Sequence, residues 1–600
     1  MTEPREEPCP DGISLGIGAA GTSARWVPNV MVPMRDGVRL ATTLLIPHEL
    51  PAPALLMRLP YGKQLYPGVV THAMLPNPFD LVMAGYAVVW QDCRGTYDSE
   101  GEFAPWVNET DDGLDTLNWI RRQEWCSGSV GMYGLSYLAM AEWMAASRSP
   151  EGLRALASGF SATDFHAAWY SSGGAMSWHS VLMWSVGLAL VDARRSLAAG
   201  EGDVEVVARL QAMADDPVPH LSVPPNQQFL LSQQLPWWSD LTTHPELDEH
   251  WRTLNPAERP ADVLVPALHL GGWFDIFIED TVRSYMRLRS GAGTEEARSG
   301  QRLIIGPWDH VNQTGVYLDR HFGPAAGAAT VGLTRAHLDH FDRSIHGTAP
   351  NDEDAPVRIF VMGIDQWRDE ADWPLPDTQY VDHYLEGAPG VNRIGNEGGL
   401  STDLPSASAV DTYVFDPADP TPTMGGRMGW RGIALNAIGP VDQRAVEARP
   451  DVLCFTSPIL QDPIEVTGHV ALVLHATSSA RDTDFTGKLV DVHPDGRAIY
   501  LTDGILRMRY RDGLDRPASM EPGRVYEITL NLGVTSNVFG RGHRIRVEVS
   551  SSNFPRYDCN PNTGRDVASE SAGRDGIRAI NRILRGANHP SRLVLPVIRR

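Results

Sequence analysis

Residues 130–138 read VGMYGLSYL, and this stretch decides the fold. Val130 to Tyr133 are typical of a buried strand, and Gly134-Leu135-Ser136-Tyr137-Leu138 then turns the chain directly into a helix. Such a turn strains the serine backbone and lifts its hydroxyl out of the sheet. The stretch therefore predicts a nucleophile at Ser136, although Gly-x-Ser also occurs in ordinary turns and Leu138 stands where the usual pattern has glycine.

Two later strands supply the partners that a serine nucleophile needs, a base to take its proton and an acid to orient that base. One aliphatic run ends in Asp275, and another breaks at Gly306-Pro307 and leads to His310. The carboxyl ends of parallel strands meet at one edge of a sheet, so Ser136, Asp275 and His310 are predicted to form a triad. Taken singly, Asp275 could cap a helix starting at Ile276, and His310 could be any of the 19 histidines.

The first third of the chain has the pattern of an α/β hydrolase core, a mostly parallel sheet with helices on both faces. A hairpin signal at Asp36-Gly37 joins two strands, and buried strands follow at 54–58 and 86–90. A helical spacing of apolar residues over 114–121 separates them from the strand before Ser136. We predict a flexible segment over 1–25 and the core over 26–161 and 257–350.

Two further domains are expected. The strand pattern fades over 162–256, which predicts a helical cap inserted into the core. From 351 to 600 apolar residues alternate with others, for example at Ile545, Val547 and Val549, which is typical of half-buried antiparallel strands. The chain is therefore predicted to end in a β-sandwich of the jelly-roll type.

The composition excludes several classes of function. The 600 residues carry 51 Lys and Arg against 74 Asp and Glu, a net charge of −23, which disfavours nucleic acid and anionic membranes as partners. The five cysteines are odd in number and lack Cys-x-x-Cys spacing, so they indicate neither a disulfide framework nor a zinc site. The N-terminus has no apolar signal segment. We expect a cytoplasmic protein without a metal or other cofactor.

The motifs resemble those of the X-prolyl dipeptidyl-peptidase/cocaine esterase family of serine hydrolases. The resemblance runs from about Val27 to Arg600 and rests on residues 91–95, 134–138, 271–275, 306–310, 482–485 and 551–555. It implies the same three domains and the triad of Ser136, Asp275 and His310. The sequence does not decide the oligomeric state, and a homodimer stays open. The resemblance also implies an oxyanion hole formed by the Tyr61 hydroxyl and the backbone N–H of Tyr137. A phenol suits that role because it is a neutral donor at pH 7, although Tyr61 could also be a packed aromatic at a strand end.

The same resemblance implies an aromatic acyl pocket lined by Trp169, Trp184, Phe277 and Trp430. Gly187 and Gly429 depart from the family pattern, because the similar esterase has leucines there. We therefore expect both glycines to widen the pocket. Large aromatic residues in a cap are more often core than ligand contacts, so a purely structural role for these side chains stays open.

The resemblance thus implies a cofactor-free esterase that acts on small carboxylic esters through an acyl-enzyme and favours benzoyl esters such as cocaine. The alternatives within the family are an X-Pro dipeptidyl-peptidase and an α-amino-acid ester hydrolase or acylase. Both must hold a substrate ammonium with carboxylates near the nucleophile, and the nearest acid on the helix after Ser136 is Glu142. A different class is an inert jelly-roll binding protein.

Overall fold

The computed structural model describes residues 12–16, 23–65, 74–349, 355–388, 390–391, 398–429 and 438–600. An eleven-stranded sheet forms the first layer, in the order β1-β2-β3-β5-β4-β6-β7-β8-β9-β10-β11. The strands from β5 to β10 pair in parallel, and those at the two edges pair antiparallel. The strands are β1 (Ile13–Gly16), β2 (Ser23–Pro33), β3 (Arg39–Pro47), β4 (Ala52–Leu59), β5 (Ala87–Asp92), β6 (Cys126–Leu135), β7 (Leu153–Gly159), β8 (Ala267–Gly272), β9 (Arg302–Gly306), β10 (Val357–Val361) and β11 (Gln366–Glu370).

Helices cover both faces of this sheet, as expected for an α/β hydrolase. Leu81, Leu333 and Phe341 pack in one apolar core, whereas Leu117, Trp143 and Leu288 pack in another. The first face carries α1 (Pro78–Met83), α13 (Ala328–Val331) and α14 (Leu333–His346), and the second carries α2 (Glu109–Arg121), α3 (Tyr137–Ala146), α11 (Ile278–Gly291) and α12 (Glu295–Ser299).

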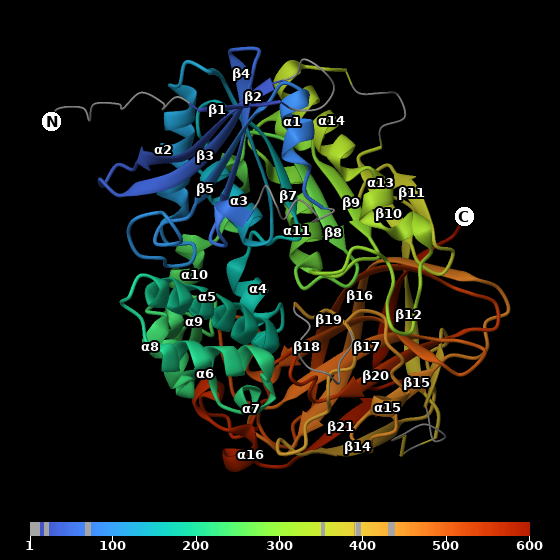
Figure 1. Cartoon of the computed structure of the whole chain (residues 1–600). Coiled ribbons are helices and arrows are strands. Elements are labelled where there is room, and N and C mark those ends of the chain that lie inside the picture. The colour runs from blue at the N-terminus through green and yellow to red at the C-terminus, as the bar shows by residue number, and fades with distance from the viewer. Residues whose placement is uncertain are drawn as a thin grey trace.

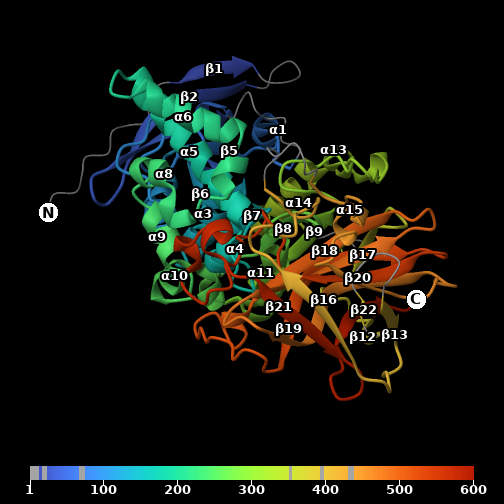
Figure 2. The same ribbon diagram turned by 90° about the horizontal axis from the view of Figure 1, so that it is seen from below.

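A layer of helices lies between β7 and β8 in the chain, within the range predicted for the cap. In Figure 1 it sits below the sheet, and in both Figure 1 and Figure 2 it lies beside the C-terminal domain. Its core is rich in buried tryptophans, including Trp169, Trp184 and Trp251. The helices are α4 (Phe165–Tyr170), α5 (Trp178–Ala198), α6 (Val204–Asp215), α7 (Val218–Leu221), α8 (Phe229–Gln234), α9 (Trp238–Thr243) and α10 (Glu249–Leu254).

The C-terminal domain is a β-sandwich whose described strand pairs are antiparallel except for β13 with β15. Trp273 and Ile278 of the hydrolase core share one apolar cluster with Leu472 and Val547 of the sandwich, so the two domains pack directly. The elements are β12 (Thr378–Glu386), β13 (Gly398–Ser401), β14 (Ala409–Phe415), α15 (Arg444–Glu447), β15 (Leu453–Thr456), β16 (Ile464–Ser478), β17 (Asp484–Val492), β18 (Ala498–Arg507), β19 (Tyr526–Phe539), β20 (Arg544–Ser550), α16 (Ala572–Asp575), β21 (Ala579–Arg585) and β22 (Arg592–Ile598).

Three sequence predictions need correction. The sheets do not change at residue 351, because β10 and β11 still pair with the hydrolase sheet. The predicted flexible segment 1–25 contains β1, whose backbone pairs with β2. The prediction of a half-buried strand at Ile545, Val547 and Val549 is wrong, because β20 is buried on both faces beyond its first residue. The first and third errors share a cause, since strand pairing and burial there depend on segments that are distant in the sequence.

No helix in the described part of the chain combines the length and the apolar character that crossing a membrane requires.

Candidate active site

Ser136 sits between β6 and α3 with φ 55° and ψ −125°, a backbone conformation that side chains larger than glycine rarely adopt. Its N–H donates to the Gly159 carbonyl of β7 at 2.9 Å, which fixes the turn to the neighbouring strand. A Cβ at Gly134 would lie 2.5 Å from the Cβ of Leu138, so this position needs glycine. The turn accommodates Leu138 in place of the usual glycine because Gly134 has no side chain that would collide with the leucine.

One chain of hydrogen bonds joins the three side chains predicted as a triad. The distance from His310 Nε2 to Ser136 Oγ is 3.2 Å, and that from His310 Nδ1 to Asp275 Oδ1 is 2.7 Å. Asp275 is fully buried, and its Oδ2 accepts the Phe277 N–H at 3.0 Å, just before α11 begins. Asp275 thus orients the histidine. The alternative that it caps a helix starting at Ile276 is wrong, because α11 begins at Ile278, its N-cap residue is Phe277, and no side chain caps its start.

The acid and the histidine are held together by their backbones. β8 and β9 end at Gly272 and Gly306, which lie side by side in register. The pairing continues past the strands, because the Phe274 N–H donates to the Trp308 carbonyl at 2.9 Å. Asp309, the neighbour of His310, instead accepts the N–H groups of Val311 and Asn312 at 2.8 and 2.7 Å, so this carboxylate shapes the loop.

Tyr137 is the first residue of α3, where backbone N–H groups have no partner within the helix. Its buried side chain is anchored, because its hydroxyl donates to Glu109 Oε1 at 2.9 Å and accepts the Trp106 N–H at 3.1 Å. Glu109 in turn pairs with the buried guanidinium of Arg58 at 2.5 Å. This network holds the start of α3 beside Ser136, and sequence reasoning missed it.

Tyr61 follows β4 and connects to the site through the cap. The indole N–H of Trp184 donates to the Tyr61 hydroxyl at 2.9 Å. Burial raises the pKa of the Tyr61 phenol, and this effect exceeds the opposite one of the Trp184 hydrogen bond. The hydroxyl therefore stays protonated at neutral pH and keeps a hydrogen to donate.

A cavity lies over Ser136, and its walls are mostly apolar. Trp169, Trp184 and Phe277, three of the predicted pocket residues, line it, and the Phe277 ring meets His310 edge-on at 5.4 Å. Trp430 lies outside the described residues. The wall consists of Ser136, Tyr137, Met140, Ala168, Trp169, Ser177, Ser180, Trp184, Ile276 and Phe277. The sequence did carry a signal for Ser177 and Ser180, since they precede Trp184 by seven and four residues and share its helix face.

The two glycines that depart from the family pattern differ in position. A Cβ at Gly429 would lie 3.1 Å from Ser180 Oγ and 3.4 Å from Ile276 Cδ1, so this glycine leaves space against the cavity wall. Gly187 is exposed on α5, and a Cβ there would meet no atom within 4 Å. The expectation that both glycines widen the pocket therefore fails for Gly187.

No acidic side chain is among the described residues that line this cavity. Glu142 is fully buried, and burial raises its pKa well above the usual range. Its Oε2 accepts the Ser158 hydroxyl at 3.0 Å, so Glu142 belongs to the packing between α3 and β7.

Comparison with known proteins places this geometry among related enzymes. Residues 36–312 match the model of the X-Pro dipeptidyl-peptidase (S15) family, and residues 351–594 match that of the X-Pro dipeptidyl-peptidase C-terminal non-catalytic domain. The chain is 45% identical to a cocaine esterase of Rhodococcus sp. over 579 residues, 95% of this chain and 98% of that one.

Two solved structures resemble the whole chain. An α-amino acid ester hydrolase is 25% identical with a TM-score of 0.79, covering 97% of this chain and 98% of its own. An aminopeptidase from a marine sediment Thaumarchaeota archaeon is 24% identical with a TM-score of 0.77 and full coverage of both chains, a likeness of fold.

Proposed function

This chain belongs to the X-Pro dipeptidyl-peptidase (S15) family and is a serine hydrolase of carboxylic esters, and we propose that it favours aromatic esters, above all benzoyl esters such as cocaine. One observation carries the proposal: the hydrogen-bonded chain Ser136–His310–Asp275 opens into a cavity walled by Trp169, Trp184 and Phe277.

The geometry supports acylation of Ser136. His310 Nε2 takes the hydroxyl proton while Ser136 Oγ attacks the ester carbonyl carbon, and Asp275 holds the opposite ring nitrogen and stabilises the imidazolium. The negative charge that develops on the carbonyl oxygen needs donors set in place beforehand. We assign that role to the backbone N–H of Tyr137 and the hydroxyl of Tyr61. His310 then protonates the departing alkoxide, which leaves an acyl-enzyme.

Deacylation repeats these steps with water as the nucleophile. His310 takes a proton from the water, whose oxygen attacks the acyl carbon. His310 then gives this proton to Ser136 Oγ, which restores the hydroxyl as the carboxylic acid product leaves. The chain's own side chains supply every proton transfer, so the proposed reaction calls for no cofactor.

The aromatic wall supports the choice of a benzoyl group. Trp169 and Trp184 lie 5.2 Å apart between ring centroids, and Phe277 closes another side of the cavity beside His310. Burying a ring contributes roughly 1.5–3 kcal/mol and aromatic pairing about 0.5–1.5 kcal/mol more, so benzoyl esters should exceed acetyl esters by about 10- to 1,000-fold in kcat/KM.

The two alternatives that must bind a substrate ammonium, an X-Pro dipeptidyl-peptidase and an α-amino-acid ester hydrolase or acylase, have less support. A neighbouring cavity does contain Glu279 and Asp280, but Glu279 pairs with Arg427 at 3.1 Å and Asp280 lies 3.5 Å from Arg283. Carboxylates already engaged by guanidinium groups attract an ammonium less strongly.

The test compares kcat/KM for phenyl benzoate and phenyl acetate on the wild type and on Trp169→Ala. We expect the benzoyl preference in the wild type and a selective loss for phenyl benzoate in the variant. Equal values for both esters in the wild type would refute the benzoyl assignment. α-Aminoacyl esters and X-Pro anilides in the same assay separate the family alternatives, and fluorophosphonate labelling of Ser136 separates all of them from an inert binding protein.

A further inference from the structure

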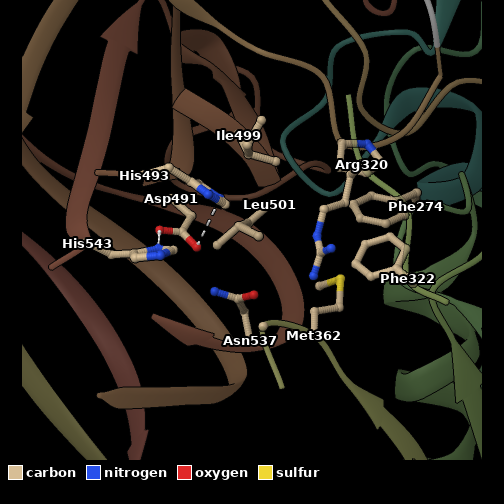
Figure 3. Close-up of a pocket in the computed structure, with 12 residues that line it drawn as sticks. Phe274, Arg320, Phe322, Met362, Asp491, His493, Ile499, Leu501, Asn537 and His543 are labelled. Atoms are coloured by element: carbon tan, nitrogen blue, oxygen red, sulfur yellow. Dashed lines mark hydrogen bonds and ion pairs between the residues drawn. The ribbon is translucent and has the colours of Figure 1, made fainter. Parts of the chain in front are cut away.

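A second group of chemically active side chains lies in the C-terminal domain, at the junction with the hydrolase core. Asp491 is on β17, His493 follows that strand, and His543 precedes β20. All three face a cavity whose opposite wall carries Phe274 and Arg320 of the hydrolase core (Figure 3). We propose that Asp491, His493 and His543 form a binding site for a divalent transition-metal cation of the Zn²⁺ class.

The donor atoms of the three residues converge. One atom from each lies within 4.8 Å of the other two, and no other group of three in the described part of the chain comes as close. Asp491 Oδ1 is 2.7 Å from His543 Nδ1, and Asp491 Oδ2 is 3.7 Å from His493 Nε2. Zn²⁺ bonds of about 2.0–2.1 Å at tetrahedral angles set donor atoms roughly 3.3 Å apart. The two observed separations bracket that value, so small side-chain rotations suffice for binding.

The backbone holds these side chains in place. Asp491 lies near the end of β17 and His493 directly after it, and in an extended chain residues two apart point to the same face. Asp491 pairs with Ile545 and Val492 with Arg544 in the ladder between β17 and β20, which brings His543 alongside. The His493 N–H donates to the Arg497 carbonyl at 2.8 Å across the turn. The site is therefore largely formed before a metal arrives.

The charges around the site fit a divalent cation. Asp491 is 4% exposed, and a buried carboxylate needs cationic partners. Two guanidinium groups are near the histidines, but Arg320 pairs with Asp365 at 2.6 Å and Arg497 with Asp495 at 2.8 Å. Their charges are thus largely compensated, so the partners that remain for Asp491 are the two imidazoles. A metal would bind these imidazoles in their neutral form and supply the positive charge that Asp491 needs.

The chemistry of the donor set narrows the metal. Two imidazoles and one carboxylate suit zinc and other first-row divalent ions, whereas Ca²⁺ and Mg²⁺ prefer oxygen ligands alone. Three protein ligands leave at least one coordination position, which would face the cavity and take water or an anion. The cysteine spacing gave no hint of such a site, because its ligands are histidines and an aspartate from segments about fifty residues apart.

The test uses the full-length chain without a histidine tag, stripped with a chelator and titrated with ZnCl₂ by calorimetry and with CoCl₂ by visible absorption. We expect one equivalent per chain and a Co²⁺ spectrum of low coordination number. His493→Gln and His543→Gln should each weaken binding by more than about tenfold. Zn²⁺ should also raise the Tm of the wild type but not that of the variants, because the ion binds the folded state preferentially.

Two controls separate this site from other histidines. His589→Gln alters a comparable group of side chains, because His589 packs against His475, which pairs with Glu527. This variant should bind one equivalent of Zn²⁺, as the wild type does. Ser136→Ala should also keep full binding, which distinguishes this site from adventitious zinc on the triad histidine. In the described part of the chain no hydrogen bond joins the His493 ring to another residue, and its ion pair with Asp491 spans 3.7 Å. His493→Gln should therefore fold even if His543→Gln does not. Wild-type binding no tighter than that of folded His493→Gln overturns the proposal.

Discussion

The indole N–H of Trp184, on cap helix α5, donates at 2.9 Å to the hydroxyl of Tyr61, which follows strand β4 of the hydrolase core. A phenol that accepts one hydrogen bond still has its own hydrogen to give. The cap therefore orients the group that we assign to the oxyanion hole, while the same indole walls the acyl cavity. In the proposed mechanism, Trp184 therefore serves both the binding of the acyl group and the stabilisation of the transition state.

Tyr61→Phe should lower kcat by about 10²–10³, roughly 2.7–4 kcal/mol, with a smaller change in KM, because the lost donor acts mainly in the transition state. The ring remains, so packing should survive. Steady-state kinetics with phenyl benzoate and a thermal melt provide the check. An unchanged kcat with a lowered Tm would make Tyr61 a structural residue.

Trp184→Phe removes the indole donor but keeps an aromatic wall. We expect a smaller loss in kcat than for Tyr61→Phe, and a double variant hardly slower than Tyr61→Phe alone, because both changes act through one hydroxyl. Kinetics of the full double-mutant cycle measure this coupling. Strictly additive effects would show that Trp184 acts on the acyl group and not on Tyr61.

Ser136→Ala should abolish ester turnover and leave the fold intact, and His310→Ala should be nearly as damaging. Triad residues act as a unit, so the double variant should be hardly slower than either single one. The measurement is kcat, with circular dichroism as the control for folding. Turnover of Ser136→Ala within a few-fold of the wild type would remove Ser136 from the mechanism.

Gly429→Leu should narrow the acyl cavity, because a Cβ there already approaches Ser180 Oγ at 3.1 Å. We expect kcat/KM to fall more for bulky aromatic acyl groups such as naphthoyl than for acetyl. Gly187→Ala is the matched control, since its Cβ meets open space, and it should change only stability, by up to about 1 kcal/mol in favour of the helix. Equal effects of Gly429→Leu on all esters would contradict a role in acyl selection.

Buried histidines should make the fold sensitive to acid. Burial lowers the pKa of His340 to about 3 and that of His269 to about 4. Above pH 6.5 these groups are neutral in both the folded and the unfolded chain, so they leave stability unchanged. Below it the unfolded chain binds protons that the folded chain refuses, and stability falls by up to about 1.4 kcal/mol per pH unit for each histidine until the folded pKa is reached.

The matching measurement is the fall in Tm between pH 7.5 and pH 5.0. It should be smaller for His340→Gln than for the wild type, whereas His48→Gln, an exposed control, should behave as the wild type does. Comparing differences in Tm removes any general destabilisation by the substitution. Equal falls in all three proteins would rule out His340 as a source of acid sensitivity.

Residues near one another in the sequence were enough to predict the hydrolase core and the positions of Ser136, Asp275 and His310. Each of these side chains follows a short aliphatic strand, and parallel strands must bring their carboxyl ends to one edge. The strained turn at Ser136 is equally local, because Gly134 and Leu138 are only four residues apart. Local sequence and the parallel pairing of the strands were therefore enough to predict the order and the place of these three side chains.

Only the tertiary structure decided which contacts between distant segments hold the residues around these three side chains. Trp184 reaches Tyr61 across 123 residues, Gly429 lies against Ser180, and Asp491 meets His543 over 52 residues. The burial of β20 on both faces likewise depends on how strands distant in sequence pack. Such contacts depend on how whole domains pack. The free energy of packing depends on both surfaces that meet, and the pattern of apolar residues in one short segment does not contain that information.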